Sequence, residues 1–195
     1  MKKSRRLQLL GLGLIICGLL ALQVNYWMGQ RAQTENKQAV QQIQEILPPR
    51  TPGVTDHYSD MQMPSLQVGG MDYVALIEVP KFGVQLPVRS QWSRLQVGSC
   101  PCRFYGTVYD GSLVVGGDHS EGQFAFLSQI QNGDAVLVTD MTGAQFAYRV
   151  SMIYRADSAS AEELMEEGYD LTLFARNSAG LEYIIVRCTA DVVSN

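Results

Sequence analysis

From Met71 onward, short apolar runs rich in Val, Ile, Tyr and Phe are separated by turn-forming residues. Runs of this length and composition are typical of β-strands. Many short strands with few helices indicate a closed or nearly closed barrel, so we expect a mainly β fold. The pattern predicts strands at Tyr73–Val79, Val84–Val88, Ser112–Val115, Ala135–Thr139, Gln145–Ile153, Tyr169–Phe174 and Glu182–Val186.

The residues between these strands predict one hairpin turn and two short helices. Residues 140–143 read Asp-Met-Thr-Gly, a sequence that suits a hairpin. One helix is expected at Glu121–Ile130, where apolar residues recur every third position, and the other at Ser160–Glu167. Ser160 and Glu163 form a capping-box pattern at the start of the second helix, and Gly168 stands where a left-handed C-cap belongs.

The N-terminus has a different pattern, with four basic residues followed by an uncharged, mostly apolar run from about Leu7 to Trp27. Roughly 20 apolar residues suffice for a helix to span the hydrocarbon core of a bilayer. The run is longer than the apolar region of a cleavable signal peptide and has no convincing Ala-x-Ala site. We therefore expect a basic tail at residues 1–6 and an uncleaved transmembrane signal anchor at residues 7–28. By the positive-inside rule, the tail stays cytoplasmic and the rest lies outside the cell.

Residues 29–70 form the expected connection between the anchor and the barrel. Gln30–Leu47 is polar and Gln-rich, with apolar residues at helical spacing, and it stops at Pro48-Pro49. This stretch predicts a helical stalk. Arg50–Gly70 has little periodicity and predicts an irregular linker. The barrel domain is then expected to occupy residues 71–195.

The charge balance excludes one class of partner. The chain has 15 basic and 19 acidic residues, for a formal net charge of −4. The four basic residues of the tail leave 11 basic against 19 acidic residues in the exported part. Nucleic-acid binding requires a basic surface, so nucleic acid is not an expected partner.

The cysteines and histidines do not form a recognisable metal or disulfide pattern. One of the four cysteines lies within the membrane run, which leaves an odd number outside, and the Cys-Pro-Cys spacing is one residue too tight for a redox or zinc motif. His57 and His119 are the only histidines, and no cysteine or carboxylate cluster accompanies them. We expect no metal and no cofactor. The cysteines are Cys17, Cys100, Cys102 and Cys188.

Several segments in order resemble the sortase family, in particular its class B-like members. Residues 170–188, which read Asp-Leu-Thr-Leu-Phe-Ala-Arg through Val-Arg-Cys, resemble the catalytic end of these enzymes. The resemblance covers Met71 to Cys188. Its other parts are Tyr73–Val88, Gln91–Leu95 followed by Cys102–Thr107, Leu113–Leu127 and Gly133-Asp134. It implies a sortase-like closed barrel of about seven to eight strands with short helices, behind the transmembrane helix and stalk, at a Gram-positive cell surface.

An intact member of this family would be a cysteine transpeptidase that acts on Leu-Pro-x-Thr-Gly-type sorting signals. In an ungapped alignment, however, Arg176 replaces the nucleophilic cysteine, Ala175 replaces the threonine before it and Tyr183 replaces the arginine. A guanidinium group stays protonated and cannot attack a carbonyl. The resemblance therefore implies former active-site positions without intact catalytic residues.

The position of the family histidine has two alternatives. Counting back from Phe124 and Leu127 places it on Asp118, with His119 next in the chain. A slip of one residue would place it on His119, but a slip on a strand end also reverses the direction of the side chain. Cys102 and Cys188 fit ordinary family positions, so we do not expect either to replace the nucleophile.

The resulting hypothesis is a membrane-anchored, extracytoplasmic pseudosortase that binds a peptide, a pilin-like protein or an active sortase. A second version of this hypothesis has a closed groove, so that only the outer surface interacts. The alternative is an active sortase that uses His119 and a non-standard nucleophile. If the hypothesis is correct, we also expect an ion pair between Arg176 and Asp118, with Tyr183 stacked on the guanidinium.

Overall fold

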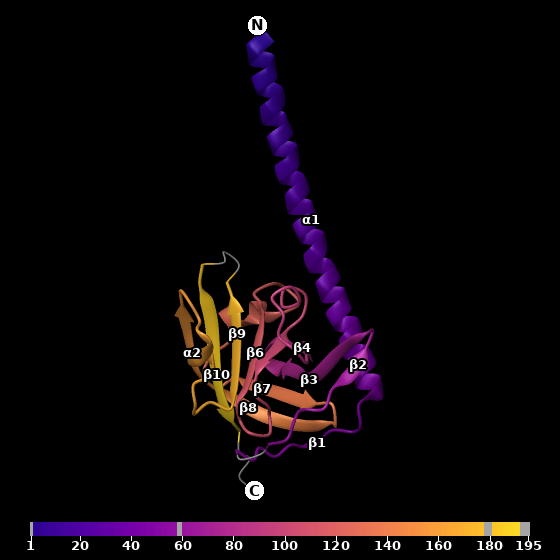
Figure 1. The fold of residues 1–195 in the computed structure, drawn as a ribbon, viewed down its shortest axis with the longest axis vertical. Coiled ribbons are helices and arrows are strands. Elements are labelled where there is room, and N and C mark those ends of the chain that lie inside the picture. Colours follow the sequence, from indigo (N-terminus) through magenta and orange to yellow (C-terminus); the bar gives the residue numbers. More distant parts are fainter. Residues whose placement is uncertain (1, 58–59, 178–180, 192–195) are drawn as a thin grey trace.

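The computed structural model describes residues 2–57, 60–177 and 181–191. A long helix, α1 (Lys2–Ile46), projects from a β-barrel, with its N-terminal part far from the barrel (Figure 1). For α1, the structure describes the side chains of all residues except 2–14, 22, 25, 26, 28 and 29. The last strand of the barrel, β10 (Tyr183–Ala190), ends on the opposite side of the barrel from the N-terminal part of α1.

Eight strands, β3 to β10, close the barrel. The sheet runs in the order β1-β8-β10-β9-β6-β5-β4-β3-β2, and β7 joins its two sides by pairing with both β3 and β8. This confirms the predicted mainly β barrel. The strands are β1 (Thr51–Pro52), β2 (Leu66–Val68), β3 (Met71–Val79), β4 (Val84–Arg89), β5 (Cys102–Tyr105), β6 (Leu113–Asp118), β7 (Ala135–Asp140), β8 (Ala144–Ala156), β9 (Leu171–Arg176) and β10 (Tyr183–Ala190).

All seven predicted strands are present, and most extend further than their apolar runs. β8 continues through Ala156, and β10 through Ala190, because the two strands pair with each other along most of their length. The sequence missed β1, β2 and β5. These strands are only two, three and four residues long, so they offer too few positions for an alternating pattern.

The hairpin prediction is confirmed and the helix predictions are correct only in part. Asp140 Oδ1 accepts hydrogen bonds from the backbone N–H groups of Thr142 (2.8 Å) and Ala144 (3.0 Å) in the turn between β7 and β8. The first predicted helix is the short 3₁₀-helix η2 (Phe124–Ser128). A further 3₁₀-turn, η1 (Pro80–Phe82), links β3 and β4.

The second predicted helix is α2 (Ala161–Leu164), which is shorter than expected. Its cap is as predicted, since Ser160 Oγ accepts a hydrogen bond from the Glu163 N–H at 3.1 Å. The predicted C-cap is wrong. The helix ends at Leu164, four residues before Gly168, because the Leu164 carbonyl accepts a hydrogen bond from a buried arginine of the barrel.

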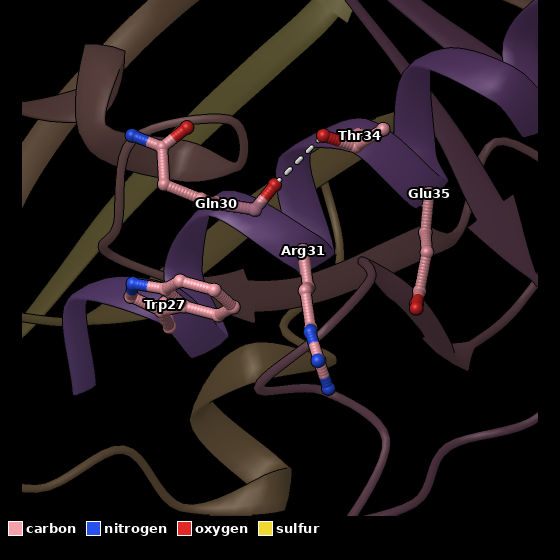
Figure 2. Close-up of a pocket in the computed structure, with 5 residues that line it drawn as sticks. All are labelled: Trp27, Gln30, Arg31, Thr34 and Glu35. Atoms are coloured by element: carbon pink, nitrogen blue, oxygen red, sulfur yellow. Dashed lines mark hydrogen bonds between the residues drawn. The ribbon is translucent and has the colours of Figure 1, made fainter. Parts of the chain in front are cut away.

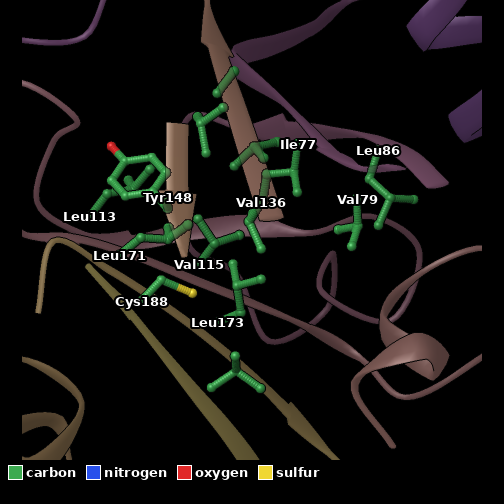
Figure 3. Packing of buried hydrophobic residues seen from close by; sticks show 14 of the residues in the cluster. Ile77, Val79, Leu86, Leu113, Val115, Val136, Tyr148, Leu171, Leu173 and Cys188 are labelled. Atoms are coloured by element: carbon green, nitrogen blue, oxygen red, sulfur yellow. The ribbon is translucent and has the colours of Figure 1, made fainter. Parts of the chain in front are cut away.

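Inward-facing residues of nearly every barrel strand form one apolar core (Figure 3). Leu113 and Val115 from β6 and Leu171 and Leu173 from β9 contribute to it from adjacent strands. Cys188 of β10 lies in the same core and is fully buried. This cysteine therefore belongs to the packing of the barrel.

The last turns of α1 pack against β4 and β2, and their apolar side chains reach side chains of β3. Ala39, Val40 and Ile43 form a second apolar cluster with Tyr73 and Leu76, and Ile43 is fully buried. β3 is buried on both faces because α1 covers the face that the barrel core does not. The predicted helical stalk is thus part of the folded domain, and α1 runs without a break through the predicted anchor and stalk.

No helix in the described part of the chain combines the length and the mean hydropathy that a membrane span requires.

The segment after α1 crosses the barrel at Gly53, and this contact supports a stability prediction. A Cβ atom at Gly53 would lie 2.7 Å from Phe146 Cζ, in a ring packed against Tyr109. We expect Gly53→Ala to lower the free energy of unfolding by about 1–3 kcal/mol in a denaturant titration, because overpacking forces the ring or the strand to move. Gly98→Ala is the matched control, since its Cβ atom would meet nothing within 4 Å. Equal stability of the two variants would contradict the prediction.

Candidate functional site

Three adjacent strands bring together Asp118, Arg176 and Tyr183, three of the four predicted site residues. β6 and β9 are parallel neighbours, with Asp118 paired to Arg176, and β9 and β10 are antiparallel neighbours, with Arg176 paired to Tyr183. The three residues therefore form one row across the sheet. The fourth, His119, immediately follows the end of β6.

Strand alternation decides which face of the sheet this row occupies. Leu171, Leu173 and Ala175 point into the barrel core, so Thr172, Phe174 and Arg176 lie on the outer face of β9. Arg176 is exposed, whereas Phe174 is covered by other aromatic rings. Its ring centroid lies 5.6 Å from those of both Trp92 and Phe104. The outer face thus carries three packed rings, those of Trp92, Phe104 and Phe174, which we call the aromatic floor. The exposed cation Arg176 follows them on β9.

The predicted stacking is confirmed, but the predicted ion pair is wrong. The Arg176 guanidinium carbon lies 5.8 Å from the centroid of the Tyr183 ring. Among the described residues, Arg176 has no ion-pair partner, and Asp118 has none either. Asp118 and Arg176 are register partners on neighbouring strands, but the guanidinium lies over Tyr183 on β10, the other neighbour of β9. A guanidinium turned toward Tyr183 on β10 is turned away from Asp118 on β6.

His119 is half-buried, and both of its ring nitrogens are buried without a hydrogen-bond partner among the described residues. A general acid needs to reach the leaving group of its substrate. His119 would have to change its side-chain position to do so. The alternation along β6 keeps Asp118 on the outer face with Arg176, so the row of side chains contains Asp118.

The described thiols outside the anchor lie away from this row or are closed off from it. Cys102 pairs with Gly116, two residues before Asp118, but it is fully buried and donates a hydrogen bond to the Cys100 carbonyl at 3.3 Å. Burial raises the pKa of Cys102, and it raises the pKa of Cys100 and of Cys188 to about 12. A thiol of such high pKa is protonated at neutral pH and is a poor nucleophile.

A hydrogen-bond network that the sequence did not reveal joins the end of β6 to α1. The Asp118 N–H donates to Gln123 Oε1 at 3.2 Å, and Gln123 Nε2 donates to the Gly98 carbonyl at 2.9 Å. Asn36 of α1, which is buried, donates to the Ser99 carbonyl at 3.0 Å and to the Gly122 carbonyl at 3.4 Å. Asn36 is one of many polar residues in a Gln-rich helix, so the sequence did not indicate that it would bind these loops.

Arg187 of β10 is a third residue that the sequence reasoning missed, after Gln123 and Asn36. It is fully buried and donates hydrogen bonds at 3.0 Å to the Leu164 carbonyl and to Thr172 Oγ1, as well as one to the Glu163 carbonyl. Its guanidinium carbon also lies 5.0 Å from the ring centroid of Tyr169. One cation therefore fixes the connection between β8 and β9 onto the outer face, where Leu164 packs in a cluster with Phe174.

Three hollows on the surface are relevant to binding. The first, of about 400 Å³, borders the aromatic floor and includes Trp92, Arg103 and Phe104 in its lining. A larger one of about 790 Å³ lies between the segment that contains β1 and the residues around Phe146. A third lies along α1 and is lined by residues of that helix only, including Trp27 and Arg31, which stack at 6.0 Å (Figure 2). Of these three, the first shares Trp92 and Phe104 with the aromatic floor, and its lining does not include Asp118, Arg176 or Tyr183.

No group of three metal-binding side chains occurs in the part of the chain that the structure describes.

Comparison with known proteins agrees with this geometry. The Sortase domain family matches residues 77–188, which is more than half of the chain. The chain belongs to the sortase family. The matched region begins in β3 and ends in β10, so it includes the row formed by Asp118, Arg176 and Tyr183.

Solved sortase structures share this fold at low sequence identity. The chain is similar to a lid mutant of sortase A from Corynebacterium diphtheriae, with a TM-score of 0.53, 18% identity, and coverage of 63% of this chain and 72% of that one. It is also similar to a Clostridium perfringens sortase D5 transpeptidase, with a TM-score of 0.52, 22% identity, and coverage of 61% and 79%. A lid mutant of Streptococcus agalactiae sortase C1 gives a TM-score of 0.54, 16% identity, and coverage of 66% and 72%.

No curated protein sequence matches this chain.

Proposed function

We propose that this chain is a catalytically inactive sortase-fold protein, anchored in the cell membrane with its barrel outside, that acts by binding. The observation that carries the proposal is Arg176, which stands on the outer face of β9 in one row with Asp118 and Tyr183. In the resemblance to active sortases, this row corresponds to the histidine, the cysteine and the arginine. None of the three catalytic side chains is present in it.

Transpeptidation makes three demands that this row does not meet. The nucleophile must be a thiolate, and Arg176 cannot replace it because its guanidinium stays protonated. A general acid must protonate the leaving amine, and the row has Asp118 where the resemblance places the histidine. A donor must also stabilise the developing oxyanion, for which Tyr183 offers a single neutral hydroxyl.

A peptide is the ligand class that the outer face suits best. The hollow beside the aromatic floor has space for a side chain next to Trp92 and Phe104, and Arg103 adds a cation to its lining. Its lining combines aromatic rings with polar side chains, which suits a peptide that offers both side chains and backbone polar groups. The ligand would be a free peptide, a segment of a pilin-like protein or a segment of an active sortase.

The membrane anchor in this proposal rests on the sequence. Four basic residues precede an uncharged run from about Leu7 to Trp27, and Trp27 and Arg31 suit the interface that ends such a run. The structure describes only some of the side chains in this run.

Incubation of the purified chain with fluorogenic sorting-signal peptides tests the proposal. We expect no cleavage and no transfer to an amine, together with saturable binding that weakens when Trp92→Ala alters the hollow. An intact sortase is the positive control for the peptides. Turnover that survives purification and disappears in His119→Ala would show the active-sortase alternative instead.

A matched variant separates binding in the hollow from binding elsewhere. Leu95 is exposed and lies outside the lining of the hollow, so Leu95→Ala should leave peptide affinity unchanged. Equal losses in Leu95→Ala and Trp92→Ala, or no binding by the unchanged chain, would contradict the assignment to the hollow.

A further inference from the structure

α1 fixes how the barrel is oriented relative to the predicted anchor. It is one continuous helix from Lys2 to Ile46, and its last turns are locked to the barrel by Ala39, Val40 and Ile43. A continuous helix transmits orientation because every turn is held by its backbone hydrogen bonds. The direction of α1 therefore determines which end of the barrel lies nearer to residues 7–28.

The contacts along α1 identify that end. Ile43 packs against Leu76 on β3, while Asn36, two turns closer to the N-terminus, contacts the loops of residues 93–100 and 119–123. These loops adjoin the end of β6 through the contacts of Gln123. Figure 1 shows the end of β9 and the start of β10 on the same side of the barrel as the N-terminal part of α1.

We call this end the strand-end surface: loops 93–100 and 119–123, the ends of β6 and β9, and residues 181–183. It carries two strongly exposed leucines, Leu95 at 94% and Leu181 at 72%. Its charges are mixed, with Arg94 and Arg176 against Asp118, Glu121 and Glu182. Apolar side chains on a surface that is held close to a bilayer can enter the headgroup region.

The helix leaves little space between this surface and the bilayer. Eight residues separate Met28, the end of the predicted anchor, from Asn36, a rise of about 12 Å along a helix. The exposed Trp27 and Arg31 on α1 mark the expected interface level within that interval. A connection as short as this part of α1 keeps the strand-end surface at a high effective concentration near the lipid headgroups.

We propose that the strand-end surface lies against the outer leaflet of the membrane, with Leu95 and Leu181 in contact with the lipid headgroup region. The proposal rests on the membrane anchor of the proposed function. Because the surface has no excess of positive charge, the two leucines and the short helical connection carry the contact, and it does not require anionic lipid. The row that contains Arg176 then faces a narrow space beside the bilayer, which favours partners that are themselves attached to the membrane.

Fluorescence quenching that depends on the depth of a probe in the bilayer tests this contact, with the full-length chain in vesicles. In a Cys17→Ser background, single cysteines introduced by Leu95→Cys, Leu181→Cys and Val54→Cys receive an environment-sensitive fluorophore. Val54 is the matched control, because it is 79% exposed and follows β1 at the other end of the barrel. Leu20→Cys reports on the anchor, and the Cys17→Ser parent reports on labelling of the native thiols.

We expect brominated phosphatidylcholine to quench probes at positions 95 and 181 about twofold or more relative to position 54, with or without phosphatidylglycerol. Quenching at position 20 alone would overturn the lipid contact and leave the anchor in place. No quenching at position 20 would remove the anchor and the contact together, while the turnover assay still decides the catalytic question. Protection of positions 95 and 181 by a co-reconstituted peptide, without quenching in lipid alone, would assign this surface to a protein and overturn the proposal.

Discussion

Arg187→Ala should lower the free energy of unfolding by about 3–5 kcal/mol, because several buried acceptors lose their donor and a cavity forms. Arg187 is fully buried, and its guanidinium satisfies the carbonyls of Glu163 and Leu164 together with Thr172 Oγ1. The variant leaves those acceptors without their donor and creates a cavity. Chemical denaturation monitored by tryptophan fluorescence measures the change.

Two further variants make this result interpretable. Arg149 also forms an ion pair, with Asp191 at 2.8 Å, but its side chain is 53% exposed, so Arg149→Ala should cost less than about 1 kcal/mol. Arg187→Met fills most of the volume without restoring the hydrogen bonds, and should lie between Arg187→Ala and the unchanged protein. If Arg187→Met is as stable as the unchanged protein, the hydrogen bonds of Arg187 do not hold the connection between β8 and β9.

Arg176→Cys should introduce a thiol that reacts with alkylating agents about a hundredfold faster than Cys100 or Cys188 near pH 8. Position 176 is exposed, so a cysteine there should have a pKa close to the ordinary value of about 8.5. Burial raises the pKa of Cys100 and Cys188 to about 12. The thiolate fractions then differ by about three orders of magnitude, and the higher nucleophilicity of the more basic thiolate offsets part of that difference.

Mass spectrometry of timed alkylation reactions, in a Cys17→Ser background, distinguishes the thiols by position. The native Cys100, Cys102 and Cys188 should label slowly near pH 6 as well, since none is activated. Rapid labelling of one of them would revive the idea of a relocated nucleophile. Labelling at position 176 as slow as that of the core cysteines would mean that β9 does not present this residue on its outer face.

The extent to which the fold could be predicted depended on strand length and pairing. β3, β4 and β7 matched their apolar runs closely, because side chains buried on one or both faces leave a clear pattern. β5 gave no such pattern: it has four residues, a register shift next to Arg103 and only a single-residue pairing with β4. Such a strand exists because its neighbours supply hydrogen-bond partners, and that information is not local.

The site, like the fold, could be predicted from the sequence only in part. The sequence pointed to Asp118, His119, Arg176 and Tyr183, and the strand register aligned three of them in one row. The predicted ion pair between Arg176 and Asp118 is wrong because the Arg176 side chain lies over Tyr183 on β10, and the sequence does not show which neighbouring strand that side chain contacts. Gln123, Asn36 and Arg187 were missed because each is a polar residue whose partners are distant in the sequence.

The sequence by itself determined the mainly β fold, the family and the absence of a cysteine at position 176, because these depend on residue identity and on short-range periodicity. Only the tertiary structure decided the orientation of Arg176 toward Tyr183, the burial of the three remaining thiols and the locking of α1 to the barrel. Each of these results depends on which strands become neighbours when the barrel closes. Closure of the barrel pairs residues that are far apart in the chain, and local strand propensity does not determine that pairing.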